Sequence, residues 1–286
     1  KSKSTVSDFL RKEIKGYVRP SEIATRNVQD NSVDRVGVKM LFLDIELSPM
    51  LLGGWGLYNQ NYSLEQVERD WQIISFSSKW AGEDHTLYKD ITESSEEEIL
   101  TSLHELLSEA SFVIGHNLRR FDLKKIKTRM LIKGMKPFPQ PRVIDTLEIV
   151  KKEFSFTSNK LAYLTQLLCK NNVKSSQESF HGYLLWKEFM KGNKDAIQEM
   201  RDYNRLDVDS LEELFHILAP WSSTLPNFDL YDDDPLDNSE WEMVGYHYSN
   251  LGKYERFQNK RTGQIKRGRK NLLSKEKRET ILTNIV

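Results

Sequence analysis

Apolar and polar positions alternate in blocks along this chain, and the clearest block is a nearly unbroken apolar run at 38–46. Such a run is typical of a central strand that is buried on both faces of a sheet. Further strands are expected at 71–80 and 85–90, where they would complete an antiparallel meander with the first. Short apolar runs at 112–117 and 142–147 predict two more strands.

Helical periodicity separates and follows these strands. Residues 95–110 carry an apolar stripe at helical spacing, with a serine cap (Ser94 or Ser95) and three glutamates in the first turn. A second helix is expected from about 119 to 133, and a long amphipathic helix over 195–218 ends before Pro220. This order predicts an α/β fold: a mixed sheet, antiparallel in its first strands and then parallel, flanked by helices.

The charge pattern divides the remainder of the chain. Residues 1–36 form a polar segment with one possible short helix near 5–15, and 37–220 is the predicted structured domain. Residues 221–244 are predicted to be an acidic linker, with seven Asp or Glu between 229 and 242. The basic tail at 245–286 has eleven Lys or Arg against three Glu, a net charge of +8. Such a tail is either a nucleic-acid contact or a solvated surface.

Composition excludes several classes of protein. Hydrophobic residues make up 38% of the chain, which is enough for a packed core. The single cysteine, Cys169, excludes an intramolecular disulfide and a cysteine-based zinc cluster. Because no run of about 18 apolar residues occurs, we expect a soluble protein with no membrane contact.

Four carboxylates stand out against this pattern. Asp44 and Glu46 are two apart where the first strand ends, so both side chains leave one face of the sheet. Asp207 follows Tyr203 by four positions on the inward face of the long helix, while Asp209 turns away from that face. Asp122 lies early in the second helix. Four acids brought together repel one another unless divalent cations neutralise them, so the set predicts a two-metal site for phosphoryl transfer.

The joint pattern is more specific than its parts. An Asp-x-Glu strand, then His116-Asn117-x3-Phe121-Asp122, then Tyr203-x3-Asp207, resembles the tyrosine subgroup of the DEDD 3′–5′ exonuclease superfamily, which has a ribonuclease H-like fold. The resemblance includes 142–147 and 158–164, and it looks closest to stand-alone phage and bacterial exonuclease-like proteins of the polymerase B type. Leu47 departs from the pattern, because the family usually has threonine there.

The resemblance implies a mechanism. Asp44 would bridge two Mg²⁺ or Mn²⁺ ions, Glu46 and Asp207 would complete one metal site, and Asp122 would hold the other partly through water. Tyr203 would orient the attacking water. The expected activity is hydrolysis of single-stranded DNA or RNA from 3′ ends with release of nucleoside monophosphates, in the cytoplasm of a bacterial or phage-infected cell.

Several neighbours of these motifs are candidates for substrate binding. His116 and Asn117 are expected to be strand-end and substrate-positioning groups rather than metal ligands. Arg119 and Arg120 either contact phosphates or form an ordinary solvated face. The aromatic residues of the glycine-rich loop after the first strand either stack on unpaired bases or pack within the loop; they are Trp55, Tyr58 and Tyr62.

The tail leaves an alternative function open. Residues 245–269 resemble a zinc ribbon that lacks its cysteines, so no structural zinc is expected. The tail either keeps the hairpin without metal or orders on a nucleic acid or protein partner. The alternative to an exonuclease is therefore a catalytically weak nuclease-fold module that binds nucleic acid or a partner through this tail. An endonuclease or junction resolvase on the same fold would lack the Tyr-x3-Asp helix. The complete set of acids favours the exonuclease.

Overall fold

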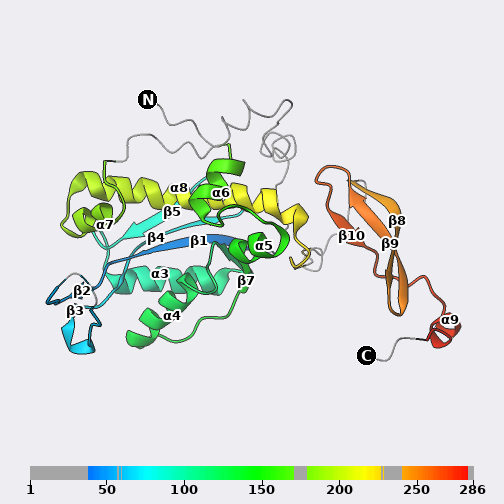
Figure 1. Ribbon diagram of the computed structural model, residues 1–286, viewed down its shortest axis with the longest axis horizontal. Coiled ribbons are helices and arrows are strands. Elements are labelled where there is room, and N and C mark those ends of the chain that lie inside the picture. Colours follow the sequence, from blue (N-terminus) through cyan, green and yellow to red (C-terminus); the bar gives the residue numbers. More distant parts are fainter. Residues whose placement is uncertain are drawn as a thin grey trace.

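The computed structural model describes residues 38–56, 58, 60–170, 179–226, 228 and 240–282 (Figure 1). The polar segment 1–36, with its expected helix, lies outside the described residues, as does 229–239 of the acidic linker. Among the helices within the described ranges, none is long and apolar enough to cross a membrane.

A five-stranded mixed sheet forms the centre of the fold, in the order β5-β4-β1-β6-β7. The pairs of β1 with β4 and of β4 with β5 are antiparallel, whereas those of β1 with β6 and of β6 with β7 are parallel. This arrangement confirms the predicted mixed sheet with its antiparallel start. The strands are β1 (Met40–Leu47), β4 (Ile73–Trp80), β5 (Leu87–Asp90), β6 (Phe112–Gly115) and β7 (Arg142–Asp145).

Helices cover both faces of this sheet (Figure 1). Two of them, α3 (Glu96–Glu109) and α4 (Asp122–Ile132), pack on one face. The other face is covered by α5 (Thr146–Glu153), α6 (Leu161–Leu168), α7 (Tyr183–Met190) and α8 (Lys194–Leu218). Of the two predicted caps of α3, Ser94 and Ser95, it is Ser95 whose side chain accepts a hydrogen bond from the backbone of Glu98.

The two faces of β1 determine where the acids lie. Leu41, Leu43 and Ile45 join the core beneath α3 and α4, whereas Met40 and Phe42 join the core beneath α8. Side chains alternate along a strand, so Asp44 and Glu46 continue the second set. Both acids therefore face α8, on which Asp207 lies.

Some elements differ from the sequence prediction. Helix α4 begins at Asp122 rather than near 119, because residues 117–121 form a turn. Within the described part of 37–220, the helices α5, α6 and α7, each eight residues long, were not predicted. Helices this short gain most of their stability from tertiary packing rather than from local sequence. A small sheet of β2 (Leu51–Leu52) and β3 (Val67–Arg69), with a 3₁₀ helix at Leu64–Gln66, also follows β1 unpredicted.

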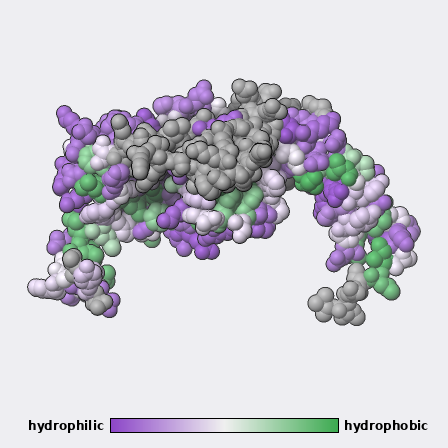
Figure 2. Space-filling model, turned by 45° about the horizontal axis from the view of Figure 1, so that its top comes forward, coloured by the Kyte–Doolittle hydropathy of each residue, from purple (hydrophilic) through white to green (hydrophobic). Residues whose placement is uncertain are grey.

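The C-terminal part has its own antiparallel sheet, in the order β10-β9-β8. Its elements are β8 (Trp241–Ser249), β9 (Gly252–Asn259), β10 (Ile265–Arg267) and the short helix α9 (Lys275–Glu279). Strand β8 spans the position where the acidic linker was expected to give way to the basic tail, at 244/245. Figure 2 shows both apolar and polar surface on this C-terminal part.

Candidate metal centre

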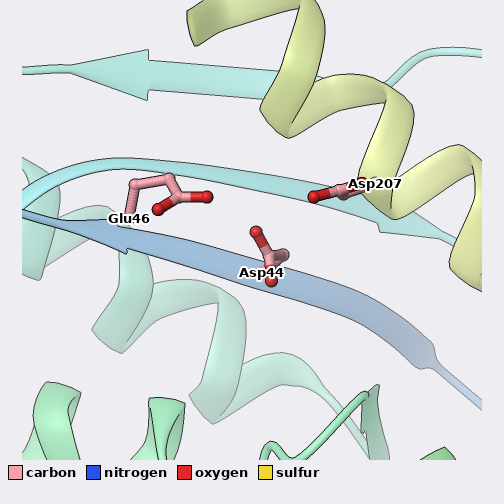
Figure 3. Close-up of side chains that lie close together, drawn as sticks. All are labelled: Asp44, Glu46 and Asp207. Carbon is pink, nitrogen blue, oxygen red and sulfur yellow. The ribbon is translucent and has the colours of Figure 1, made fainter. Parts of the chain in front are cut away.

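Three carboxylates converge between β1 and α8. One ligand oxygen from each of Asp44, Glu46 and Asp207 lies within 4.8 Å of the others, although β1 and α8 are far apart in the chain. Figure 3 shows the three carboxylates directed into the same space, two from the strand and one from the helix. Asp44 and Glu46 thus lie on the same face of β1, as their spacing predicts.

Mutual repulsion and burial oppose ionisation of this group. Burial, and then the charges of Glu46, Asp122 and Asp207, raise the pKa of Asp44 well above its usual range. Burial, followed by the charges of Asp207 and Asp122, raises the pKa of Glu46 to about 8. Without a cation, burial and mutual repulsion therefore favour the protonated, neutral form of Asp44 and Glu46 near neutral pH.

An asparagine that the sequence analysis missed holds Asp44 in place. Asn204 is fully buried, and its Nδ2 donates a 2.6 Å hydrogen bond to Oδ2 of Asp44. Its Oδ1 accepts from the hydroxyl of Ser75, 3.5 Å away on β4. Ser75 and Ser77 lie opposite Glu46 and Asp44 in the β1–β4 register, and both are fully buried. Small side chains on β4 leave room here for the acids beneath α8.

Tyr203 lies against the acids, as the Tyr-x3-Asp spacing predicts. Its hydroxyl donates a hydrogen bond to Asp207, and burial together with the charges of Asp207, Glu46 and Asp44 raises the pKa of the phenol. The ring packs edge-on against Trp186 of α7, with 6.1 Å between ring centroids. Trp186 in turn donates a hydrogen bond to Glu46. The sequence offered no signal for Trp186, since it is an aromatic residue on a short helix.

Asp122 reaches the same region from the opposite helix layer. The parallel ladder between β1 and β6 runs only as far as Phe42 and Ile114, and beyond it Oδ1 of Asp122 accepts a 3.3 Å hydrogen bond from the backbone of Ile45. Asp122 is 5% exposed, and burial raises its pKa to about 7. Its charge acts on Asp44 and Glu46, but it is not part of the closely spaced group of three.

A tight turn between β6 and α4 presents Asp122. Gly115 ends the strand, and a Cβ there would lie 2.6 Å from that of Leu118, so only glycine fits. Asn117 has a φ of 68°, a left-handed conformation that asparagine tolerates better than most residues. The carboxylate of Asp145 accepts hydrogen bonds from the backbones of Asn117, Arg119 and Leu147. Asp145 therefore has a structural role in this turn.

His116 is fully engaged inside the protein. Its Nε2 lies 2.8 Å from the carbonyl oxygen of Asn159, and its Nδ1 lies 2.9 Å from the hydroxyl of Thr146. Burial lowers the pKa of the imidazole, and because a carbonyl oxygen can only accept, the ring donates through Nε2. These bonds tie the end of β6 to α5 and to the loop before α6. Because both ring nitrogens are engaged within the protein, the structure gives no support for the predicted contact of His116 with substrate.

The remaining charged candidates lie at the margin of the site. The Arg119 guanidinium donates to the carbonyl of Val143 and pairs with Glu148, whereas Arg120 is exposed. Asp209, excluded on helical geometry, accepts a hydrogen bond from Thr86 and pairs with Lys79, away from the three acids.

The aromatic loop after β1 projects into solvent. Trp55 and Tyr58 are almost fully exposed, and Tyr62 is 46% exposed. Tyr62 lies against Gly54, where a Cβ would be 3.1 Å from its ring. Tyr62 thus packs partly within the loop. Trp55 and Tyr58 are exposed enough that their rings could stack on unpaired bases.

Comparison with known proteins assigns the family. Residues 41–219 match the RNase H superfamily, a span that contains the sheet and all four acids. The chain belongs to the RNase H superfamily. The resemblance to DEDD exonucleases fits this assignment.

Other comparisons are more distant. The fold is similar to that of the family B DNA polymerase from the hyperthermophilic archaeon Pyrobaculum calidifontis, with 15% identity and a TM-score of 0.47. That similarity covers 64% of this chain and 25% of the polymerase, so the chain spans about a quarter of the polymerase's length. No curated protein matches the sequence.

The acids of this RNase H domain suit a divalent cation. Oxygen ligands, and carboxylates above all, are those that Mg²⁺ and Mn²⁺ prefer. Among the described residues, the charges that raise the pKa values of Asp44 and Glu46 are those of other acids. Asp44, Glu46 and Asp207 can thus hold a divalent metal, and the burial of their carboxylates would strengthen its attraction.

Proposed function

We propose that this chain is a metal-dependent 3′–5′ exonuclease that hydrolyses single-stranded DNA or RNA and releases nucleoside monophosphates. The observation that carries the proposal is the convergence of Asp44 and Glu46 with Asp207, and the hydrogen bond from Tyr203 to Asp207. Membership of the RNase H superfamily supports nuclease chemistry on a nucleic acid. The Tyr-x3-Asp spacing, now placed beside the strand acids, supports the exonuclease subgroup.

The residues take distinct roles in this proposal. Asp44, Glu46 and Asp207 would bind Mg²⁺ or Mn²⁺, and Asp122 would support the metals from outside this group of three. Two bound ions supply activation of water and stabilisation of the leaving 3′ oxygen. The separation of Asp122 from the group of three supports an indirect role for it.

Tyr203 would position the attacking water rather than remove its proton. Its raised pKa keeps the phenol protonated near neutral pH, so it donates a hydrogen bond but is a poor base. Its hydroxyl is anchored on Asp207, and its ring is held by Trp186. Both contacts fix the hydroxyl beside the acids, as a positioning role requires.

Labelled oligonucleotides test the activity and its polarity together. Single-stranded DNA, duplex DNA and RNA, each labelled at the 5′ or the 3′ end, are incubated with the protein in Mg²⁺ or Mn²⁺. A 3′–5′ exonuclease gives a ladder of shortened products from the 5′ label and an immediate mononucleotide from the 3′ label. The substrate that is shortened fastest identifies the preferred nucleic acid.

Variants on one helix provide the matched control. Asp207→Asn removes a carboxylate from the group of three, whereas Asp209→Asn removes one from an outer ion pair two residues away. We expect Asp207→Asn and Asp44→Ala to abolish shortening and Asp209→Asn to retain it. Wild-type protein that leaves every substrate intact with either metal would overturn the proposal, as would equal activity in all variants.

A further inference from the structure

The two faces of the C-terminal sheet carry different side chains. Tyr246 lies opposite Glu255 and Tyr248 lies opposite Lys253 in the β8–β9 register, and directly opposed residues share a face. Continuing this register across the three strands defines one face, here called the aromatic face. It comprises Trp241, Met243, Tyr246, Tyr248, Lys253, Glu255, Phe257 and Lys266.

Large apolar side chains on this face are exposed. Tyr248 is 66% exposed, Met243 47% and Tyr246 42%. Surface of this kind on a small sheet is typical of an interaction site when polar groups surround it.

Lysines are interleaved with the aromatic rings. The Lys253 ammonium lies 3.8 Å from the ring centroid of Tyr246 and 5.8 Å from that of Tyr248. Lys266 of β10 lies 5.0 Å from the ring of Trp241. Two cations thus run along a row of aromatic rings, a combination that suits a strand with flat bases and a charged backbone.

The backbone beneath these side chains is fixed by contacts within the tail. Oδ1 of Asn271 accepts from the backbone of Lys253, and the carbonyl of Lys253 accepts from Leu272 at 2.7 Å. The chain after β10 therefore returns to hold the start of β9. A surface ordered before binding loses less entropy when a ligand binds.

The positive charge of the C-terminal part favours an anionic partner. Residues 245–282 carry eleven Lys or Arg against three Glu, a net charge of +8 in a chain whose overall net charge is zero. On the aromatic face itself, Lys253 and Lys266 outnumber Glu255. A polyanion complements this charge, and exposed aromatic rings add a preference for unpaired bases.

We propose that the aromatic face of the C-terminal sheet binds single-stranded nucleic acid, with Tyr246 and Tyr248 stacking on bases and Lys253 and Lys266 contacting phosphates. This inference does not depend on the proposed exonuclease activity, because no residue of the metal centre takes part. It gives the tail a binding function of its own.

Binding of the full chain is measured by fluorescence anisotropy in EDTA, so that hydrolysis cannot interfere. The probes are labelled oligothymidylate, oligouridylate and an abasic oligonucleotide with the same phosphate backbone. We expect the wild type to bind both base-containing strands at least about fivefold more tightly than the abasic strand. The double variant Tyr246→Ala/Tyr248→Ala should lose that preference and weaken binding by about tenfold or more.

Matched variants separate stacking from loss of structure. Tyr246→Phe/Tyr248→Phe keeps both rings and should keep the affinity. His247→Ala changes an exposed aromatic residue on the same strand but on the opposite face, and it should bind like wild type. Hydrogen exchange of the β8 and β9 amides confirms that each variant retains its sheet.

Salt dependence tests the lysines. Lys253→Ala and Lys266→Ala should each reduce the slope of log affinity against log salt by about 0.7 for a single strand. The proposal is overturned if the double alanine variant binds like wild type, if His247→Ala weakens binding as much, or if the abasic strand binds as tightly as the others. Equal affinity for polyglutamate would also overturn it and would point to an acidic protein partner.

Discussion

Asn204 donates its hydrogen bond to Asp44 from the same helix that carries Tyr203 and Asp207. The bond runs from the helix to the strand, so it sets the orientation of the Asp44 carboxylate relative to Asp207. Asn204 is fully buried, and Ser75 holds the other side of its amide. It is therefore a positioning residue for the metal centre.

Replacing Asn204 should weaken metal binding without removing a ligand. Partners that orient ligands typically contribute about 10- to 100-fold to metal affinity or activity, so we expect Asn204→Ala to fall in this range. Titration of activity with Mn²⁺ measures the shift, and saturating metal should restore part of the rate. Gln198→Ala, on an exposed turn of α8, is the control. Unchanged metal dependence in Asn204→Ala would contradict the positioning role.

The pKa of Glu46 predicts how the stability of the metal-free protein changes with pH. Burial first, and then neighbouring acids, raise this pKa from 4.5 to about 8. Between these values the folded protein holds a proton that the unfolded chain has released, so the free energy of unfolding falls as pH rises. Glu46→Gln removes this titration. We expect the variant to unfold several degrees higher than wild type at pH about 8.5 in EDTA, and the difference to vanish towards pH about 5.

Bound metal should reverse this difference, so that wild type unfolds at a higher temperature than Glu46→Gln. A cation that binds the folded state at about 100 times its dissociation constant adds about 2.7 kcal/mol of stability. Mn²⁺ at high pH should therefore raise the melting temperature of wild type and much less that of Glu46→Gln. Thermal unfolding with and without Mn²⁺ at several pH values provides the test. An equal rise in both proteins would show that Glu46 is not a ligand.

Period-two alternation explains why the strand acids could be predicted from sequence. Met40 and Phe42 are buried under α8, and Asp44 and Glu46 share their face because nothing interrupts the strand between them. The four-residue spacing of Tyr203 and Asp207 likewise places them on one face, since α8 is a regular helix throughout. Where regular geometry holds, local spacing is sufficient to group the side chains.

The remaining site contacts depend on packing that local spacing does not specify. Trp186 reaches Glu46 only because α7 packs on α8, and α7 is too short to give a clear pattern. Asp122 meets the backbone of Ile45 only because β6 ends before β1 does. Asn204 did offer a signal, because it is a polar residue four positions after Met200 on the inward face of α8.

Tyr203→Phe separates the hydroxyl from the ring. The phenylalanine ring can keep the edge contact with Trp186, so stability should change little, whereas the hydrogen bond to Asp207 is lost. If the hydroxyl positions water, the turnover rate should fall by about 100-fold with little change in KM. Steady-state kinetics on the preferred oligonucleotide measures both. A large rise in KM with an unchanged rate would instead assign Tyr203 to substrate binding.

Asn117 allows a conformational role to be separated from a substrate contact. Its left-handed backbone, at φ 68°, is available to glycine without strain but costs alanine about 1 kcal/mol or more. If the residue serves only the turn that presents Asp122, Asn117→Gly should keep both stability and activity, whereas Asn117→Ala should unfold at lower denaturant. If its amide contacts the substrate, both variants should raise KM alike. Denaturant unfolding and kinetics on the two proteins distinguish these results. Backbone strain affects only the alanine variant, whereas a lost substrate contact affects both variants.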